Sequence, residues 1–274
     1  MNENEKEKES WREFEIIDTH AHVFPSKVSS KAAYNIGRFY DLPAHHDGSC
    51  EELLENGSAY GVSRYVICSV ATTPHQVADI NNFIAAQQKE HEEFFGFGAL
   101  HPMMHGVGDE VERIISLGLH GIKLHPDFQC FDIDCPEAYE IYEAARGRLP
   151  ILIHVGDDRY DYSRPRKLAK VADDFPDLQI IAAHLGGFRK WDEAWDYLKK
   201  PGIKYDVSST MPVASIGRTR KQLYYMGVEN CFFGTDYPLW DYGDALRRFM
   251  SLELPYEDCK KVFSENFKEF MGLS

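Results

Sequence analysis

Two histidines separated by one residue, His20 and His22, follow an apolar run that begins at Ile16. Successive side chains of a strand point to opposite faces, so residues two apart point to the same side. Two imidazoles on one side of a strand end can therefore bind one metal ion together. The alternative is a pair of strand-end histidines without a ligand, and the pair alone does not decide between the two.

Three later apolar runs also end in a residue that can ligate a metal: His154, His184 and Asp236. Imidazole nitrogens and a carboxylate oxygen suit Zn²⁺ or a similar divalent ion. Three or four such ligands with one open position make a catalytic site, because water bound there has a pKa of about 7. Asp236 is suited to bind the ion and to move a proton. His184 is suited to polarise a substrate or move a proton, with a satisfied core histidine as the alternative.

The elements that could bring these distant residues together are strands, because the chain alternates strand-like runs with amphipathic helical runs. We expect eight strands, at residues 15–23, 65–71, 94–100, 121–126, 150–154, 179–183, 203–208 and 231–236. After the first, they recur at about thirty residues, the length of one βα unit. Eight units predict an α/β protein with a single-domain (β/α)₈ TIM barrel rather than an open doubly wound sheet. The carboxyl ends of barrel strands converge, so the five candidate residues would meet there.

Two further features describe the connections between these strands. Residues 24–48 are polar and aromatic and predict a long loop. Ser49 and Glu52 form a capping-box pattern at the start of the first helix. No G-x-G-x-x-G motif follows the first strand, which disfavours a dinucleotide-binding fold.

Charge and composition exclude several partners. The net charge of −14 argues against binding nucleic acid or an anionic membrane. Cys68 and Cys231 lie in apolar runs, as expected of reduced core thiols in a cytoplasmic protein. No apolar run is long enough to span a membrane. Residues 1–12 predict a mobile polar tail and residues 13–274 the barrel; a homodimer is left open.

Four motifs stand at strand ends in order along the chain: Asp18-Thr19-His20-Ala21-His22, Ile153-His154-Val155-Gly156, Ala183-His184-Leu185-Gly186-Gly187 and Gly234-Thr235-Asp236-Tyr237-Pro238. Together they resemble the amidohydrolase superfamily, most of all the amidohydrolase-related branch that includes aminocarboxymuconate-semialdehyde and resorcylate-type decarboxylases. The resemblance implies that His20, His22 and His154 bind a metal and that Asp236 is both ligand and proton carrier. It implies that His184 is the active-site histidine beside the metal.

The resemblance covers both hydrolysis and decarboxylation, so it does not choose the reaction. Our first hypothesis is a metal-dependent hydrolase of a small ester, amide or lactone, in which Asp236 passes a proton to the leaving group. The alternative is a metal-dependent carboxy-lyase that acts on a small carboxylic acid. A third hypothesis is a binding or scaffold protein on a barrel that has lost its activity, and the complete ligand set argues against it.

Residues near strands four and five predict the substrate pocket and the number of metals. Lys123 and His125 share strand parity, and the loop after strand five adds Arg159 and Arg164, which could hold a substrate carboxylate. The alternative for these arginines is a solvated loop. Strand four has no acid to bridge two ions, and an unmodified Lys123 would repel a second cation. We therefore expect one divalent ion per chain, with zinc as the predicted metal.

Overall fold

The structure is a computed structural model that describes residues 7–273 of the chain. Its eight strands belong to one sheet in the order β1-β2-β3-β4-β5-β6-β7-β8, so each strand lies beside its neighbours in sequence. The described part of the chain divides into two compact units: the residues up to 65 together with those from 207 on (unit 1), and residues 66–206 (unit 2). Strand β2 (Val62–Cys68) runs from unit 1 into unit 2. We describe each unit by itself.

Unit 1 contains the first and last elements of the chain. Its first half consists of η1 (Glu7–Glu13), β1 (Ile16–His22), α2 (Ser29–Tyr40) and α3 (Cys50–Ala59). Its second half consists of α10 (Ile216–Met226), η4 (Val228–Asn230), β8 (Cys231–Phe232), α11 (Tyr242–Met250), α12 (Tyr256–Lys260), η5 (Lys261–Glu265) and α13 (Asn266–Met271). Backbone hydrogen bonds join β1 to the segment after β8, from Thr19 N to Phe233 O (3.0 Å) and from His22 N to Tyr237 O (2.7 Å). The first and last strands are therefore neighbours.

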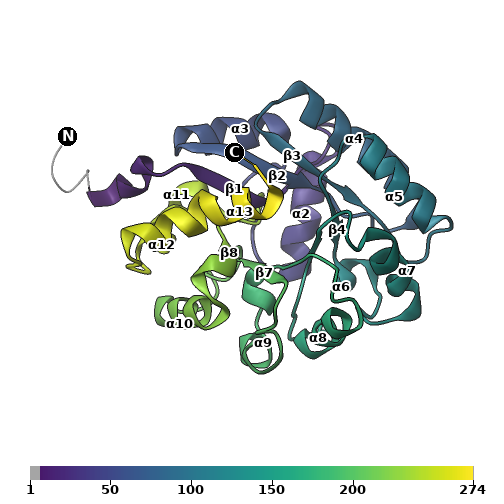
Figure 1. Ribbon diagram of the computed structural model, residues 1–274. Coiled ribbons are helices and arrows are strands. Elements are labelled where there is room, and N and C mark those ends of the chain that lie inside the picture. Colours follow the sequence, from purple (N-terminus) through teal and green to yellow (C-terminus); the bar gives the residue numbers. More distant parts are fainter. Residues whose placement is uncertain (1–6, 274) are drawn as a thin grey trace. The chain divides into compact units, whose positions relative to one another are not determined.

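Unit 2 contains the central strands and the helices that pack on them. These elements are η2 (Pro74–Gln76), α4 (Val77–Glu90), β3 (Phe94–Ala99), α5 (Val107–Ser116), β4 (Gly121–Leu124), α6 (Pro126–Gln129), α7 (Pro136–Ala145), β5 (Ile151–Ile153), α8 (Pro165–Asp174), β6 (Ile180–Ala182), η3 (His184–Gly186), α9 (Trp191–Tyr197) and β7 (Ile203–Asp206). Strands β3 to β7 pair in parallel, and α4, α5, α7 and α8 lie on their outer side (Figure 1). Ile151, Leu152 and Ile153 are all buried, as expected of a strand covered on both faces.

The strand order and the intervening helices confirm the predicted (β/α)₈ barrel fold. All eight predicted strands are present, with ends that differ by a few residues. The largest difference at a strand end is at β8, which ends at Phe232 although the prediction extends to Asp236. Asp236 has a left-handed backbone (φ 66°), which a regular strand cannot contain. Cys68 and Cys231 are buried and are not part of a disulfide bond, as predicted of core thiols.

The predicted loop at residues 24–48 is wrong for its central part, because helix α2 occupies Ser29–Tyr40. The helix buries Ala33, Gly37 and Tyr40 along one side, a helical spacing within a largely polar sequence. Gly37 is required there, since a Cβ atom would lie 2.5 Å from Leu42 O. Tertiary contact on a narrow apolar stripe therefore stabilises this helix.

The start of the chain shows where the folded part begins. Residues 1–6 of the predicted tail lie outside the described residues, whereas Glu7–Glu13 form the short helix η1. Within η1, Trp11 is 2% exposed and its indole Nε1 donates to Tyr60 O (3.1 Å). The folded part of the chain therefore includes residues before position 13.

The helix after the α2 segment begins as its sequence predicts. Ser49 is the N-cap of α3, and its hydroxyl accepts a hydrogen bond from Glu52 N (3.2 Å). The Glu52 carboxylate accepts from Asp47 N instead of closing the reciprocal bond to Ser49. Between residues 7 and 273, no helix combines the length and apolar character needed to cross a bilayer.

Candidate metal centre

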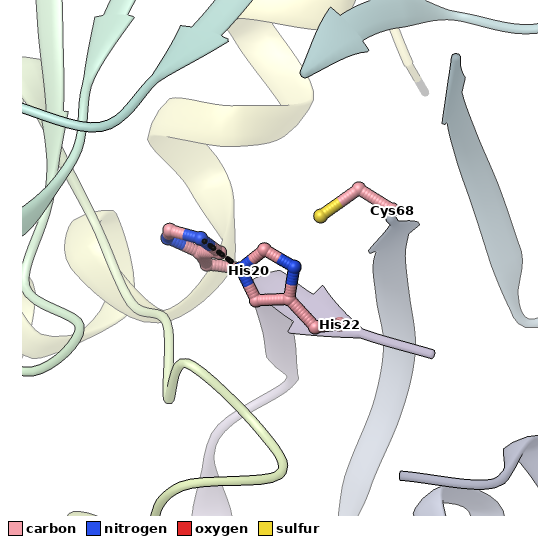
Figure 2. Close-up of side chains that lie close together, drawn as sticks. All are labelled: His20, His22 and Cys68. Carbon is pink, nitrogen blue, oxygen red and sulfur yellow. Dashed lines mark hydrogen bonds between the residues drawn. The ribbon is translucent and has the colours of Figure 1, made fainter. Parts of the chain in front are cut away.

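In unit 1, the carboxyl end of β1 and the segment after β8 bring three ligand-type side chains together. His20 and His22 are both buried, with Nε2 atoms 3.2 Å apart, so they point to the same side of β1 as predicted (Figure 2). Asp236 N donates to His20 O (2.8 Å), which fixes Asp236 beside the two rings. Its Oδ1 lies 3.5 Å from His20 Nε2 and 3.4 Å from His22 Nε2.

These three atoms have the separation expected of ligands to one ion. Atoms that bind Zn²⁺ at about 2.1 Å in tetrahedral geometry lie roughly 3.4 Å from one another. The three measured separations range from 3.2 to 3.5 Å. Two imidazole nitrogens and one carboxylate oxygen also form a donor set suited to a first-row divalent metal. The residues present in unit 1 therefore fit a metal ion.

Hydroxyl groups that follow β7 orient two of these side chains. Ser208 Oγ lies 3.0 Å from His20 Nδ1, which leaves Nε2 as the nitrogen that faces His22 and Asp236. Ser209 Oγ donates to Asp236 Oδ2 (2.5 Å), which leaves Oδ1 facing the two histidines. For His20 and Asp236, a hydrogen bond on the opposite side of the group therefore selects the atom that faces the other candidate ligands.

A buried carboxylate beneath the three ligands joins β1 to the segment after β8. Asp18 is fully buried and accepts hydrogen bonds from Thr235 Oγ1 (2.5 Å), Tyr242 OH (2.6 Å) and the backbone N–H groups of His20 and Thr235 (3.0 Å each). Burial raises the pKa of this carboxyl group to about 6, and the hydrogen bonds oppose that rise. Asp18 thus holds His20 and Thr235, the residue before Asp236, in one network.

We expect Asp18→Ala to lower the free energy of unfolding by about 3 kcal/mol, because it leaves four buried donors without an acceptor. Urea unfolding followed by circular dichroism measures this loss. Tyr242→Phe is the matched control, since it removes one of the four donors and is expected to cost about 1 kcal/mol. A loss for Asp18→Ala no larger than that of the control would contradict this role.

In unit 2, the ends of three neighbouring strands bring three histidines together. The registers pair Leu124 with Ile153 and Ile153 with Ala182, so β4, β5 and β6 end at one level. The His125 ring stacks on the His154 ring, with centroids 4.0 Å apart and planes 9° apart. His154 Nδ1 lies 3.0 Å from His184 Nε2. The strand ends thus place the predicted residues His125, His154 and His184 in one buried cluster.

The backbone after β5 determines which nitrogen of His154 carries the proton. His154 Nε2 lies 2.7 Å from Gly156 O, and a carbonyl oxygen is only an acceptor, so we assign the proton to Nε2. Nδ1 is then the acceptor in the contact with His184 Nε2. Gly156 is required for this turn: its φ is 85°, and a Cβ atom would lie 2.6 Å from Phe188 N.

His184 is held in an unusual backbone conformation. Its φ is 60° and that of the next residue, Leu185, is 50°, both in the left-handed region that non-glycine residues rarely adopt. His184 N donates to Asp206 Oδ1 (3.1 Å), and Trp191 Nε1 donates to His184 O (3.0 Å). Backbone strain of this kind is concentrated at functional sites, because the surrounding contacts must maintain it.

Asp127 is a member of the unit 2 cluster that our sequence analysis did not assign to the site. Its carboxylate is 3% exposed; Oδ2 accepts from Ser163 Oγ (2.6 Å) and lies 3.6 Å from His154 Nε2. Among the described residues, its Oδ1 is one of few buried side-chain atoms without a hydrogen-bond partner. Burial raises the pKa of Asp127 to about 7. The sequence feature that could have indicated Asp127 is its position two residues after His125, just past the end of β4.

The His125, Asp127 and His154 side chains also have potential ligand atoms within 4.8 Å of one another. The hydrogen bonds disfavour a second ion there. His125 Nδ1 accepts from Phe128 N (3.2 Å), which places the His125 proton on Nε2. His154 Nε2 is also protonated, as argued above. In two of the three groups, the nitrogen assigned as N–H therefore has no lone pair to offer a cation, and the single metal stays a prediction.

The predicted substrate residues have different surroundings within unit 2. Lys123 is buried in β4 at 1% exposure. Arg159 forms a two-pronged ion pair with buried Asp157 (2.9 and 2.7 Å). Its charge opposes the rise in the pKa of Asp127 that burial causes, so it lies near the histidine cluster. Arg164 forms ion pairs with Asp161 and Glu193 (2.7 Å each), which join the start of α8 to α9. Arg164 would have to give up one of these pairs to bind a substrate.

Comparison with known proteins agrees with this fold. The profile of the amidohydrolase family matches residues 17–273. Among curated proteins, no sequence matches the chain closely enough to count as a relative.

Several solved structures have the same fold at low sequence identity. The 5-carboxyvanillate decarboxylase of Sphingomonas paucimobilis is 17% identical, with a TM-score of 0.74 over 95% of this chain and 100% of that chain. The 5-carboxyvanillate decarboxylase of Novosphingobium aromaticivorans, in complex with manganese and a nitrobenzoic acid, is 15% identical, with a TM-score of 0.76 over 96% and 97%. A proposed 2-pyrone-4,6-dicarboxylic acid hydrolase of Pseudomonas putida is 15% identical, with a TM-score of 0.68 over 94% and 98%. The match of the family profile to nearly the whole chain shows that this protein belongs to the amidohydrolase family.

Proposed function

We propose that this protein is a metal-dependent carboxy-lyase that removes carbon dioxide from a small carboxylic acid. The assignment of a metal site rests on three donor atoms, His20 Nε2, His22 Nε2 and Asp236 Oδ1, which lie 3.2 to 3.5 Å from one another. Support for the reaction comes from the solved structures of similar fold, several of which are decarboxylases of hydroxybenzoic acids, two of them with bound manganese.

His154 is the fourth ligand in this proposal. Its support is the Ile153-His154-Val155-Gly156 motif at the end of β5, to which the resemblance assigns a metal ligand. Zinc suits the imidazole-rich set, whereas manganese is the ion named with the structures of similar fold, so either divalent ion is a candidate. When bound, the ion would supply a positive charge that binds the substrate carboxylate and stabilises negative charge as the bond to that carboxylate breaks.

The chain's own residues would then supply and control the proton. Decarboxylation breaks one carbon–carbon bond, leaves its electron pair on the substrate carbon and releases CO₂, so that carbon must receive one proton. We assign this transfer to Asp236 and His184, which are the acid–base groups of the motifs that carry the resemblance. The left-handed backbone of each residue supports a functional role, because such strain is maintained at active sites.

The substrate carboxylate calls for cations from the protein as well. Lys123 and Arg159 are the candidates. Arg159 lies on the loop after β5, where an ion pair with buried Asp157 holds its guanidinium group in place. His125 could contribute its Nε2–H as a donor, because Phe128 N occupies Nδ1. Arg164 is the weaker candidate, since two ion pairs already hold its guanidinium group.

Hydrolysis of a small ester, amide or lactone is the second candidate. The specific observation in its favour is the Asp236 carboxylate beside the two histidines, since a base at this point can take a proton from an attacking water and pass it to the leaving group. The similar fold of the proposed 2-pyrone-4,6-dicarboxylic acid hydrolase also supports it.

One experiment separates the two reactions. The protein, loaded with Zn²⁺ or Mn²⁺, is incubated in D₂O with hydroxybenzoic acids, including 5-carboxyvanillate and 2,6-dihydroxybenzoate, and with lactones, including 2-pyrone-4,6-dicarboxylate. A carboxy-lyase releases CO₂ and leaves deuterium on the carbon that carried the carboxylate, which NMR detects. A hydrolase opens the lactone without release of CO₂. Turnover of lactones alone would refute the carboxy-lyase proposal.

We also propose that residues 13–274 act as one domain in the cytoplasm on a small-molecule substrate, without a nucleic-acid partner. A homodimer is the oligomeric state to test, by light scattering of the purified protein.

A further inference from the structure

We infer that Ser209 is a positioning residue that makes Asp236 a one-oxygen ligand of the metal and that Trp240 holds Ser209 in place for this task. The inference rests on the proposed metal site of His20, His22 and Asp236. It adds two residues that none of the strand-end motifs contains.

The contacts form a short chain within unit 1. The indole Nε1 of Trp240 donates to Ser209 Oγ (2.8 Å), and Ser209 Oγ donates to Asp236 Oδ2 (2.5 Å). Ser209 is 3% exposed and Asp236 is 7% exposed, so water does not readily replace either bond. The indole can only donate, so the serine hydroxyl must direct its own proton at the carboxylate. Trp240 therefore determines the direction of the Ser209 hydroxyl.

With the Ser209 hydroxyl in this direction, the two carboxylate oxygens of Asp236 have different partners. Oδ1 lies 3.5 Å and 3.4 Å from the Nε2 atoms of His20 and His22, within the range for ligands to one ion. Oδ2 is engaged by Ser209 on the other side of the carboxylate. A carboxylate without this bond could rotate and bind the ion through both oxygens, which would occupy a position that the substrate needs. With a metal ion bound, the Ser209 hydroxyl would thus keep one coordination position open.

The backbone conformation of Ser209 and Asp236 also supports a functional role for the hydrogen bond between them. Ser209 has φ 49° and Asp236 has φ 66°, so both partners of the bond adopt the left-handed conformation. Serine has no particular preference for that region, and glycine would adopt it without steric cost. The hydrogen bond between the two side chains is consistent with a role that glycine at position 209 could not fill, because glycine has no hydroxyl.

The test uses the full-length apo protein and Co²⁺, whose visible absorption reports coordination number. Ser209→Ala and Ser209→Gly both remove the hydroxyl, and glycine also relieves the backbone. We expect both variants to bind Co²⁺ roughly 10-fold more weakly than the wild type, as for other groups that orient a metal ligand. We also expect weaker visible absorption, since a carboxylate bound through two oxygens raises the coordination number. Trp240→Phe should shift both quantities in the same direction by less.

A control variant and the contrary outcomes complete the test. Ser215→Ala removes a hydroxyl that caps helix α10 in the same unit, so it should lower the melting temperature of the apo protein and leave Co²⁺ binding unchanged. Wild-type affinity and absorption in both Ser209 variants would overturn the inference. So would recovery of wild-type Co²⁺ binding in Ser209→Gly alone, which would assign the effect to backbone strain. Failure of the wild type itself to bind Co²⁺ would instead refute the proposed metal site.

Discussion

Alanine at both His20 and His22 is expected to abolish metal binding and all turnover while the protein remains folded. These residues supply two of the three donor atoms found at 3.2 to 3.5 Å from one another in unit 1. Loss of two ligands leaves a site that cannot compete with water for the ion. Elemental analysis of dialysed protein measures the effect: we expect one ion per wild-type chain and a stoichiometry near zero in the double variant.

Two controls accompany this measurement. His75→Ala changes an exposed histidine of η2 and should leave the metal content unchanged. Circular dichroism should show the same secondary structure for the double variant, because β1 is also held by Asp18 and by backbone bonds to the segment after β8. The melting temperature should rise on addition of metal to the wild type and not to the variant. Undiminished metal in the double variant would contradict the assignment.

Asp236→Asn is expected to lower kcat by roughly a thousandfold or more, whichever of the two reactions the protein catalyses. The amide cannot carry the proton, although its oxygen can still face His20 and His22. Metal content should therefore fall much less than in the double histidine variant. Steady-state kinetics at saturating metal, on the substrate identified in the D₂O experiment, separates the loss of proton transfer from the loss of metal.

Asp241→Asn is the matched control for this substitution. It makes the same chemical change five residues later, where Asp241 caps helix α11 through a hydrogen bond from Asp244 N (2.9 Å). Asparagine caps a helix about as well as aspartate, so activity and stability should stay close to those of the wild type. Near-normal turnover in a fully metallated Asp236→Asn protein would remove Asp236 from proton transfer and would leave it only as a ligand.

The sequence was sufficient for the fold, because the strand order follows from local patterns. Eight apolar runs at the spacing of βα units predicted the strand order that the structure has. The alternation of side chains along β1 placed His20 and His22 on one side without any knowledge of distant residues. The missed helix α2 shows the limit of this approach, since its buried face is too small to produce a strong periodic signal in a polar segment.

The tertiary structure alone decided which atoms of these residues are available. Ser208, Ser209 and Trp240 lie outside the strand-end motifs, and their role depends on hydrogen bonds between segments far apart in the sequence. Asp127 likewise belongs to the histidine cluster only because neighbouring strands end at one level. Sequence periodicity records which side of a strand a residue faces, whereas the hydrogen-bond partner of each oxygen and nitrogen depends on contacts across the fold. Residue types and spacing therefore predicted a metal centre, and only the folded chain showed that Asp236 Oδ1 faces the two histidines while Oδ2 is held by Ser209.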